Sequence, residues 1–219
     1  WLKAKNKDKE AIKVAIGMDS RLSGKALKGV LKADMENIRA TMEKIDYNTF
    51  EDVVNNIFAA KRIYIIGLRS SMALAEFLGF YLNIILQNVK TVGYGISDIF
   101  EQMINVGEGD LVIGIGFPRY ASRTIDALAF AQDRGARVVA VTDSFLSPLA
   151  TRADYALIAQ SNMASFVDSL VAPLSVINAL IIAVGMREKD NISSTFNSLE
   201  EIWQEYNVYS YNNRNVGDD

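Results

Sequence analysis

An arginine and two serines stand directly behind the first strongly apolar run of this 219-residue chain. The run at residues 63–66 has the β-branched composition of a buried strand, and Gly67 ends it. Arg69, Ser70 and Ser71 follow, where a helical pattern begins. The unpaired N–H groups and the positive dipole end of a helix N-terminus favour an anion. We therefore predict a phosphate-binding turn here; simple capping of the helix by a serine is the alternative.

A second turn of the same kind follows the apolar run at 110–115 and opens another helical pattern. Ligands of open α/β sheets bind beyond the carboxyl ends of the strands, so two neighbouring turns of this kind can share one ligand. Arginine supplies charge-assisted donors suited to phosphate, and serine, threonine and tyrosine supply hydroxyls. The predicted ligand-binding residues of the second turn are Arg119, Tyr120, Ser122 and Thr124.

Other polar residues lie at predicted strand ends and are weaker candidates. Asp143 and Ser144 follow a strand pattern and suit a ligand hydroxyl, although capping of the short helix after Pro148 explains them equally well. The last predicted loop carries polar side chains that are placed to close the site. The weaker candidates are Gly67, Asp98, Asp143, Ser144, Asn162 and Ser165.

The composition excludes several kinds of chemistry. The chain has no histidine and no cysteine, so it has neither imidazole acid–base catalysis nor thiolate or imidazole metal ligands. We predict no metal and no cofactor. The net charge is −3, which gives no general reason to expect direct binding to nucleic acid.

Strand and helix patterns alternate along the chain. This alternation predicts an α/β fold, a three-layer αβα sandwich around a five-stranded parallel sheet of the flavodoxin-like kind. Right-handed crossovers then place all the strand-to-helix turns at one rim of the sheet. The strands are expected at 62–67, 89–93, 111–115, 137–141 and 155–158, and the helices between and after them at 70–86, 97–106, 122–134 and 165–186.

Two further helices are expected before the first strand. The first, over 29–44, carries apolar residues at helical spacing, which predicts packing on the sheet or on a partner chain. Thr49 is expected to cap the second. The uncharged stretch 169–186 barely reaches the length of a membrane span, and a buried helix explains it better, so no membrane partner is expected. We divide the chain into a helical region at 1–45, the main domain at 46–190, and a C-terminal helix with a disordered tail at 191–219.

Several motifs resemble those of the sugar isomerase (SIS) domains of RpiR-like transcriptional regulators. The similarity covers about residues 30–187, and the turn Phe-Pro-Arg-Tyr at 117–120 is specific to one branch of that family. The other matching segments are 66–71 with Leu74-Ala75, 134–136, 142–144, 146–150 and 153–154. The resemblance implies that residues 1–45 match the helical linker to a helix-turn-helix domain, which is absent from this chain.

The resemblance also implies a function and a set of partners. It implies a cytoplasmic sensor that binds a phosphorylated sugar or a related anion at the rim and reaches DNA only through the absent domain. The helices at 70–86 and 165–186 and the first two helices offer more apolar surface than one sheet face requires, so we predict a homodimer. By position, Ser70 and Ser71 match the first phosphate turn of the family, and Ser122 and Thr124 match the end of the second. Relatives usually have serine at the position of Gly116, so this chain lacks one hydroxyl of the family site.

Three alternatives remain open from the sequence. SIS domains include aldose–ketose isomerases, which need a base near neutral pKa; without histidine, Asp98 or Glu101 would have to serve after a shift by burial. A nucleotide-binding domain is less well supported, because the first turn lacks the later glycines of a pyrophosphate loop. A domain that binds no ligand and acts only as an oligomerisation scaffold is the third.

Overall fold

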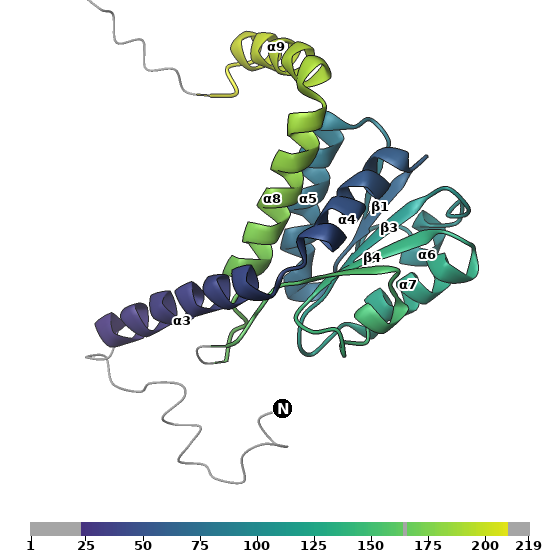
Figure 1. Ribbon diagram of the computed structural model, residues 1–219. Coiled ribbons are helices and arrows are strands. Elements are labelled where there is room, and N and C mark those ends of the chain that lie inside the picture. The colour runs from purple at the N-terminus through teal and green to yellow at the C-terminus, as the bar shows by residue number, and fades with distance from the viewer. Residues whose placement is uncertain (1–22, 164–165, 210–219) are drawn as a thin grey trace, which may run out of the picture.

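The predicted five-stranded parallel sheet is confirmed by a computed structural model, which describes residues 23–163 and 166–209 (Figure 1). The strand order is β2-β1-β3-β4-β5, and all neighbouring pairs are parallel. Because the sheet is parallel, the carboxyl ends of all five strands meet at one edge. The strands are β1 (Ile63–Ile66), β2 (Val89–Val92), β3 (Leu111–Ile115), β4 (Arg137–Thr142) and β5 (Tyr155–Ile158).

Helices cover both faces of this sheet and complete the predicted three layers. On one face lie α4 (Tyr47–Ala59), α5 (Met72–Ile85) and α8 (Val171–Arg187). On the other lie the short α6 (Ile99–Gln102) and α7 (Ser122–Asp133). The strand β1, which lies between β2 and β3, is buried on both sides: its alternate side chains contribute to the two different apolar clusters. Burial on two faces is why its sequence is continuously apolar.

Two helices extend away from the layers. Figure 1 shows α3 (Ser23–Lys44) projecting beyond the sheet near the start of α8, and α9 (Lys189–Glu205) following α8 at the other end. Of the two packing partners predicted for the apolar residues of α3, the sheet is excluded, because these residues are exposed in this chain; packing on a partner chain stays a prediction. The exposed apolar residues are Leu27, Val30, Leu31, Met35, Ile38 and Met42. Residues 1–22 of the predicted linker and 210–219 of the predicted tail lie outside the described part.

Three local predictions need correction. Asp46, and not Thr49, caps α4: its carboxylate accepts from the backbone N–H groups of Asn48 and Thr49. The helix expected at 97–106 is the single turn α6. The helix expected from residue 165 begins only at Val171, so the residues just before it belong to a loop.

The long apolar helix α8 is a core helix, as expected from its sequence. One side of it, including Ile177, Leu180 and Val184, is buried against the sheet and α5. Among the described residues, no single helix is long and apolar enough to cross a membrane; α8 and α9 meet that test only when counted together, and they are bent by 107°.

Candidate functional site

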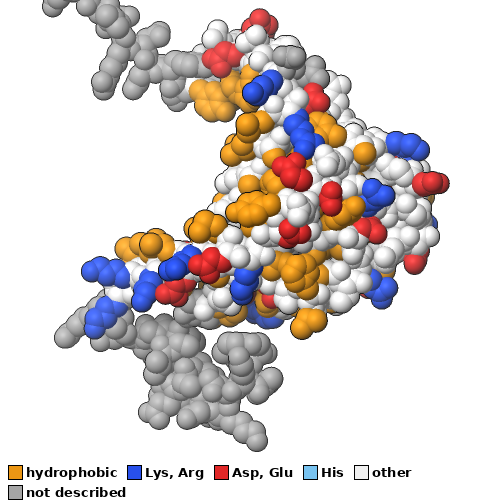
Figure 2. All heavy atoms as spheres, in the orientation of Figure 1, with side chains coloured by type: hydrophobic (Ala, Val, Ile, Leu, Met, Phe, Trp, Pro, Cys, Tyr) orange, Lys and Arg blue, Asp and Glu red, His pale blue; other side chains and the backbone are white. Residues whose placement is uncertain are grey.

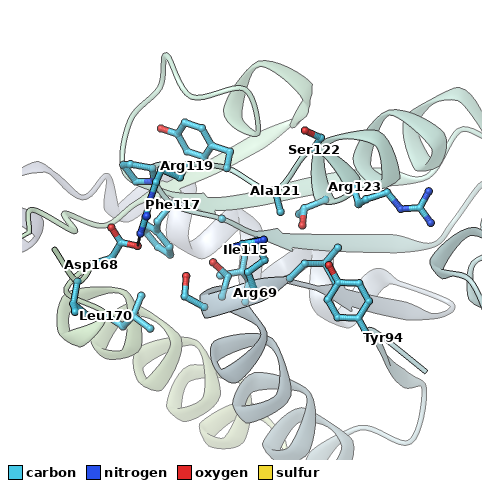
Figure 3. A pocket seen from close by; sticks show the side chains of 18 of the residues that line it. Arg69, Tyr94, Ile115, Phe117, Arg119, Ala121, Ser122, Arg123, Asp168 and Leu170 are labelled. Atoms are coloured by element: carbon cyan, nitrogen blue, oxygen red, sulfur yellow. Dashed lines mark ion pairs between the residues drawn. The ribbon is translucent and has the colours of Figure 1, made fainter. Parts of the chain in front are cut away.

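The two predicted anion-binding turns line one cleft. The cleft has a volume of about 650 Å³ and lies at the carboxyl edge of β1 and β3 (Figure 3). Three segments build it: residues 68–71 between β1 and α5, residues 115–124 between β3 and α7, and residues 166–170 before α8; Tyr94, after β2, completes the lining. All seven main candidates line the cleft: Arg69, Ser70, Ser71, Arg119, Tyr120, Ser122 and Thr124.

The first turn approaches the sheet so closely that only glycine fits at residue 67. A Cβ there would come within 2.6 Å of the Ser71 carbonyl oxygen, in the 3-10 turn that leads into α5. Gly67 therefore has a packing role and does not line the cleft. Within the described residues, neither the Ser70 nor the Ser71 hydroxyl serves as a helix cap, contrary to the capping alternative.

The second turn also lacks a side-chain cap. The N-cap residue of α7 is Ala121, which has no side-chain acceptor for the first-turn N–H groups. Ser122 is exposed at the first position of α7, whereas Thr124 is buried and its Oγ1 has no hydrogen-bond partner in the described residues. An uncapped helix N-terminus beside a buried unpaired hydroxyl is a place where an anion gains hydrogen bonds.

The cleft has a net positive charge, because three arginines and only one carboxylate line it. Arg119 forms an ion pair with Asp168, at 3.7 Å between nitrogen and oxygen. Arg123 forms an ion pair with Asp98 and lies over the ring of Phe100. Figure 3 shows the Arg119–Asp168 pair at one end of the cleft and Arg123 with Tyr94 at the other. Arg69 lies between them and has no ion-pair partner among the described residues.

Tyr120 points its hydroxyl toward a carboxylate rather than leaving it free. It donates a hydrogen bond of 2.7 Å to Asp143, which also accepts one from the Thr142 hydroxyl. Burial, and then the bond to Asp143, raise the pKa of Tyr120 well above its usual range. Tyr120 is therefore neutral at physiological pH and offers a ligand its ring and the lone pairs of its oxygen.

Most of the weaker candidates lie outside the cleft lining. The Ser144 hydroxyl accepts from the N–H of Leu146 within its own turn, and Asn162 holds α3. Ser165 lies outside the described residues. Asp98 caps α6 in a reciprocal capping box with Glu101. These two carboxylates, the proposed isomerase bases, are exposed and serve as helix-capping groups.

Gly116 lines the cleft, and the side chain of Leu149 leaves no room for a serine at this position. A Cβ at this position would come within 2.8 Å of the side chain of Leu149, which is completely buried. The leucine occupies the space that a serine side chain would need.

The sequence reasoning missed Asp168. The sequence pattern places it inside the helix expected at 165–186, but α8 starts three residues after it, and the Asp168 side chain is only 8% exposed. One signal could have found it: Asp168 is the only charged residue between 155 and 186. A single charge in a long apolar stretch needs a partner or a ligand.

A metal site requires several charged or polar side chains that converge on one ion. Within residues 23–163 and 166–209, no three acidic side chains gather where they could hold a metal ion. The donor set of the cleft, guanidinium groups, hydroxyls and helix N-termini, suits an anion.

The fold and the cleft define a class: a doubly wound parallel α/β domain with a cleft at the carboxyl edge of its sheet. The SIS domain model matches residues 56–183, which is more than half of the chain, and the chain belongs to the SIS domain family.

The similar proteins include transcriptional regulators. An uncharacterised HTH-type transcriptional regulator of Haemophilus influenzae is 30% identical over 118 residues, 54% of this chain and 41% of the relative. This chain thus spans about two fifths of that protein. The sugar isomerase domain of an RpiR transcription factor from Sphaerobacter thermophilus is 30% identical, with a TM-score of 0.75 over 78% of this chain and 96% of that one.

The fold is shared with a protein whose structure holds a bound ligand. Vibrio vulnificus NanR, solved in complex with ManNAc-6P, has a TM-score of 0.68 at 19% identity, over 88% of this chain and 73% of NanR.

Proposed function

We propose that this chain is the effector-binding domain of a cytoplasmic transcriptional regulator, and that its effector is a phosphorylated sugar. The observation that carries the proposal is the cleft: two helix N-termini without side-chain caps face it, together with three arginines and one carboxylate. The relatives support the regulatory role, and NanR, which shares the fold, is bound to a sugar phosphate.

The phosphate is assigned to the two helix N-termini. There the backbone N–H groups, the hydroxyls of Ser70, Ser71 and Ser122, and the guanidinium groups of Arg69 and Arg119 can all donate to its oxygens. The sugar ring then lies toward Tyr94 or toward Phe117 and Leu170, which give the cleft its apolar surface. The missing hydroxyl at Gly116 shifts the ligand preference relative to family members that have serine.

The proposed regulator acts as a homodimer. The exposed apolar side chains of α3 continue onto α8, where Ile182 and Met186 are exposed (Figure 2). A second copy of the chain would bury them, and would bring together two DNA-binding domains located outside these 219 residues. Analytical ultracentrifugation tests this: a dimer is expected, and a monomer at high concentration contradicts it. Met35→Glu with Ile38→Glu should shift the dimer toward monomer.

A melting-temperature screen tests the effector. Sugar phosphates, amino-sugar phosphates and inorganic phosphate are added to the wild type, Arg69→Gln and a matched control, Arg152→Gln, whose arginine lies outside the cleft lining. Ligand that binds only the folded state raises the melting temperature by mass action. A shift in the wild type and in the control that is lost in Arg69→Gln supports the proposal. The absence of any shift contradicts it.

Turnover decides between sensor and isomerase. Asp98 and Glu101, the two bases of the isomerase alternative, are occupied in capping α6, and Asp168 is paired with Arg119, so the bound sugar phosphate is expected to stay unchanged. Conversion of an aldose phosphate to the ketose by the purified chain would make it an enzyme.

A further inference from the structure

The helix α3 is attached to the domain by its polar side. Asn37 and Thr41 are almost completely buried, at 1% and 5% exposure, whereas the apolar residues of the helix face outward. Buried polar side chains must be hydrogen-bonded, so their partners fix the position of the helix.

Those partners all belong to the segment that joins β5 to α8. Asn37 makes two backbone hydrogen bonds with Asn162, donating to its carbonyl at 3.0 Å and accepting from its N–H at 3.1 Å. The Thr41 hydroxyl accepts from the N–H of Gln160 at 2.8 Å. Ser169 donates to the carboxylate of Asp34 at 2.6 Å. One connection therefore holds α3 at several points.

The same connection also enters the cleft. Asp168, the residue before Ser169, forms the ion pair with Arg119, so two consecutive residues serve the cleft and α3. The Asp168 side chain is 8% exposed, and its Oδ1 has no hydrogen-bond partner among the described residues. Arg119 is thus the cation that compensates a buried carboxylate.

We propose that the Arg119–Asp168 pair couples the cleft to α3; the role of the ligand in this coupling rests on the function proposed above. A phosphate drawn to the cleft competes with Asp168 for the Arg119 guanidinium. Without its cation, the buried carboxylate moves toward water, because an uncompensated buried charge is strongly destabilising. The connection moves with it and releases the hydrogen bonds to α3. Ligand binding and attachment of α3 are then linked equilibria that oppose each other.

Three variants test the coupling without any ligand, by hydrogen exchange of the full chain. Arg119→Gln removes the cation and should speed exchange in α3 several-fold. Asp168→Asn removes the buried negative charge that Arg119 compensates, so the amides of α3 should stay protected from exchange. In the double variant Arg119→Gln/Asp168→Asn protection should return. Exchange in the peptides of α4 serves as the control for general destabilisation of the domain. Arg152→Gln is the control variant, because it also removes one arginine, but one outside the cleft lining.

The outcomes are distinct. Faster exchange confined to α3 and residues 159–170 in Arg119→Gln, reversed in the double variant, supports the coupling. Unchanged α3 exchange, equal acceleration in α4, or no reversal overturns it. A second arm adds inorganic phosphate to the wild type. If phosphate raises the melting temperature but leaves α3 protected, the coupling is overturned. If phosphate gives no melting shift, the result counts against the proposed function alone, because the variants still decide the coupling.

Discussion

Arg69 and Arg119 adopt the same left-handed backbone conformation, with φ of 59° and 63°, in the two turns that face each other across the cleft. Each is in the turn that follows a buried strand and precedes a helix. Left-handed backbone is disfavoured for residues other than glycine. Both turns therefore have a strained backbone at the residue whose guanidinium group lines the cleft.

The backbone and the charge of Arg69 can be separated by mutation. Glycine accepts φ of 59° without strain, and the relief offsets its extra unfolded-state entropy, so Arg69→Gly should change the free energy of unfolding by less than about 1 kcal/mol. Arg69→Val places a β-branched residue in the left-handed region and should cost about 1–2 kcal/mol. Urea unfolding measures both. Equal stability of the two variants would show that the conformation is not strained.

Substitutions at Gly116 and Leu149 should have non-additive effects on the free energy of unfolding. Gly116→Ser introduces a Cβ that collides with the buried Leu149 side chain, at a cost of about 1–3 kcal/mol from overpacking. Leu149→Val should shorten that side chain and relieve the contact. The double variant is therefore expected to be more stable than the sum of the two single effects. Strict additivity in urea unfolding would mean that the two side chains do not compete for space.

The sequence was sufficient for the three layers, the five-stranded parallel sheet and the meeting of the two polar turns at one rim, because these depend on burial and on turn composition. It was insufficient where tertiary contacts decide. The apolar stripe of α3 has the spacing of a core-facing helix, yet Asn37 and Thr41 face the domain, since the partners offered there are backbone groups of a loop. Asp168 was missed for a related reason: only the fold places it beside Arg119.

The Tyr120–Asp143 bond should contribute to stability in a pH-dependent way. The pKa of Tyr120 is raised in the folded state, so its contribution is complete below the unfolded pKa of about 10 and is lost as the pH rises above it. Tyr120→Phe should cost about 0.5–1.5 kcal/mol at pH 7 and should weaken the alkaline loss of stability. Urea unfolding at pH 7 and at pH 10.5 measures both. Parallel alkaline losses in wild type and variant would contradict this account.

Asp46 should stabilise α4 from the N-cap and should do so only when ionised. Its hydrogen bonds, first from the Thr49 hydroxyl and then from the backbone of Asn48 and Thr49, lower its pKa. The contribution is therefore present above the unfolded pKa of about 4 and is lost as the pH falls through the folded value. Asp46→Ala should lower the melting temperature at pH 7 more than at pH 3. Thr49→Ala should have the smaller effect, and the reverse order would restore Thr49 as the cap.

The Arg123–Asp98 pair should limit the affinity of the cleft for anions. Asp98 caps α6, and asparagine caps equally well, so Asp98→Asn removes the charge that holds Arg123 but keeps the helix. An exposed ion pair contributes roughly 0.2–1 kcal/mol, so the freed guanidinium should tighten binding of a sugar phosphate by about two- to fivefold. Calorimetric titration measures this, with Asp126→Asn, outside the cleft lining on α7, as the matched loss of one negative charge. Equal tightening in both variants would indicate net charge alone, and an unchanged affinity in Asp98→Asn would show that Arg123 does not bind the ligand.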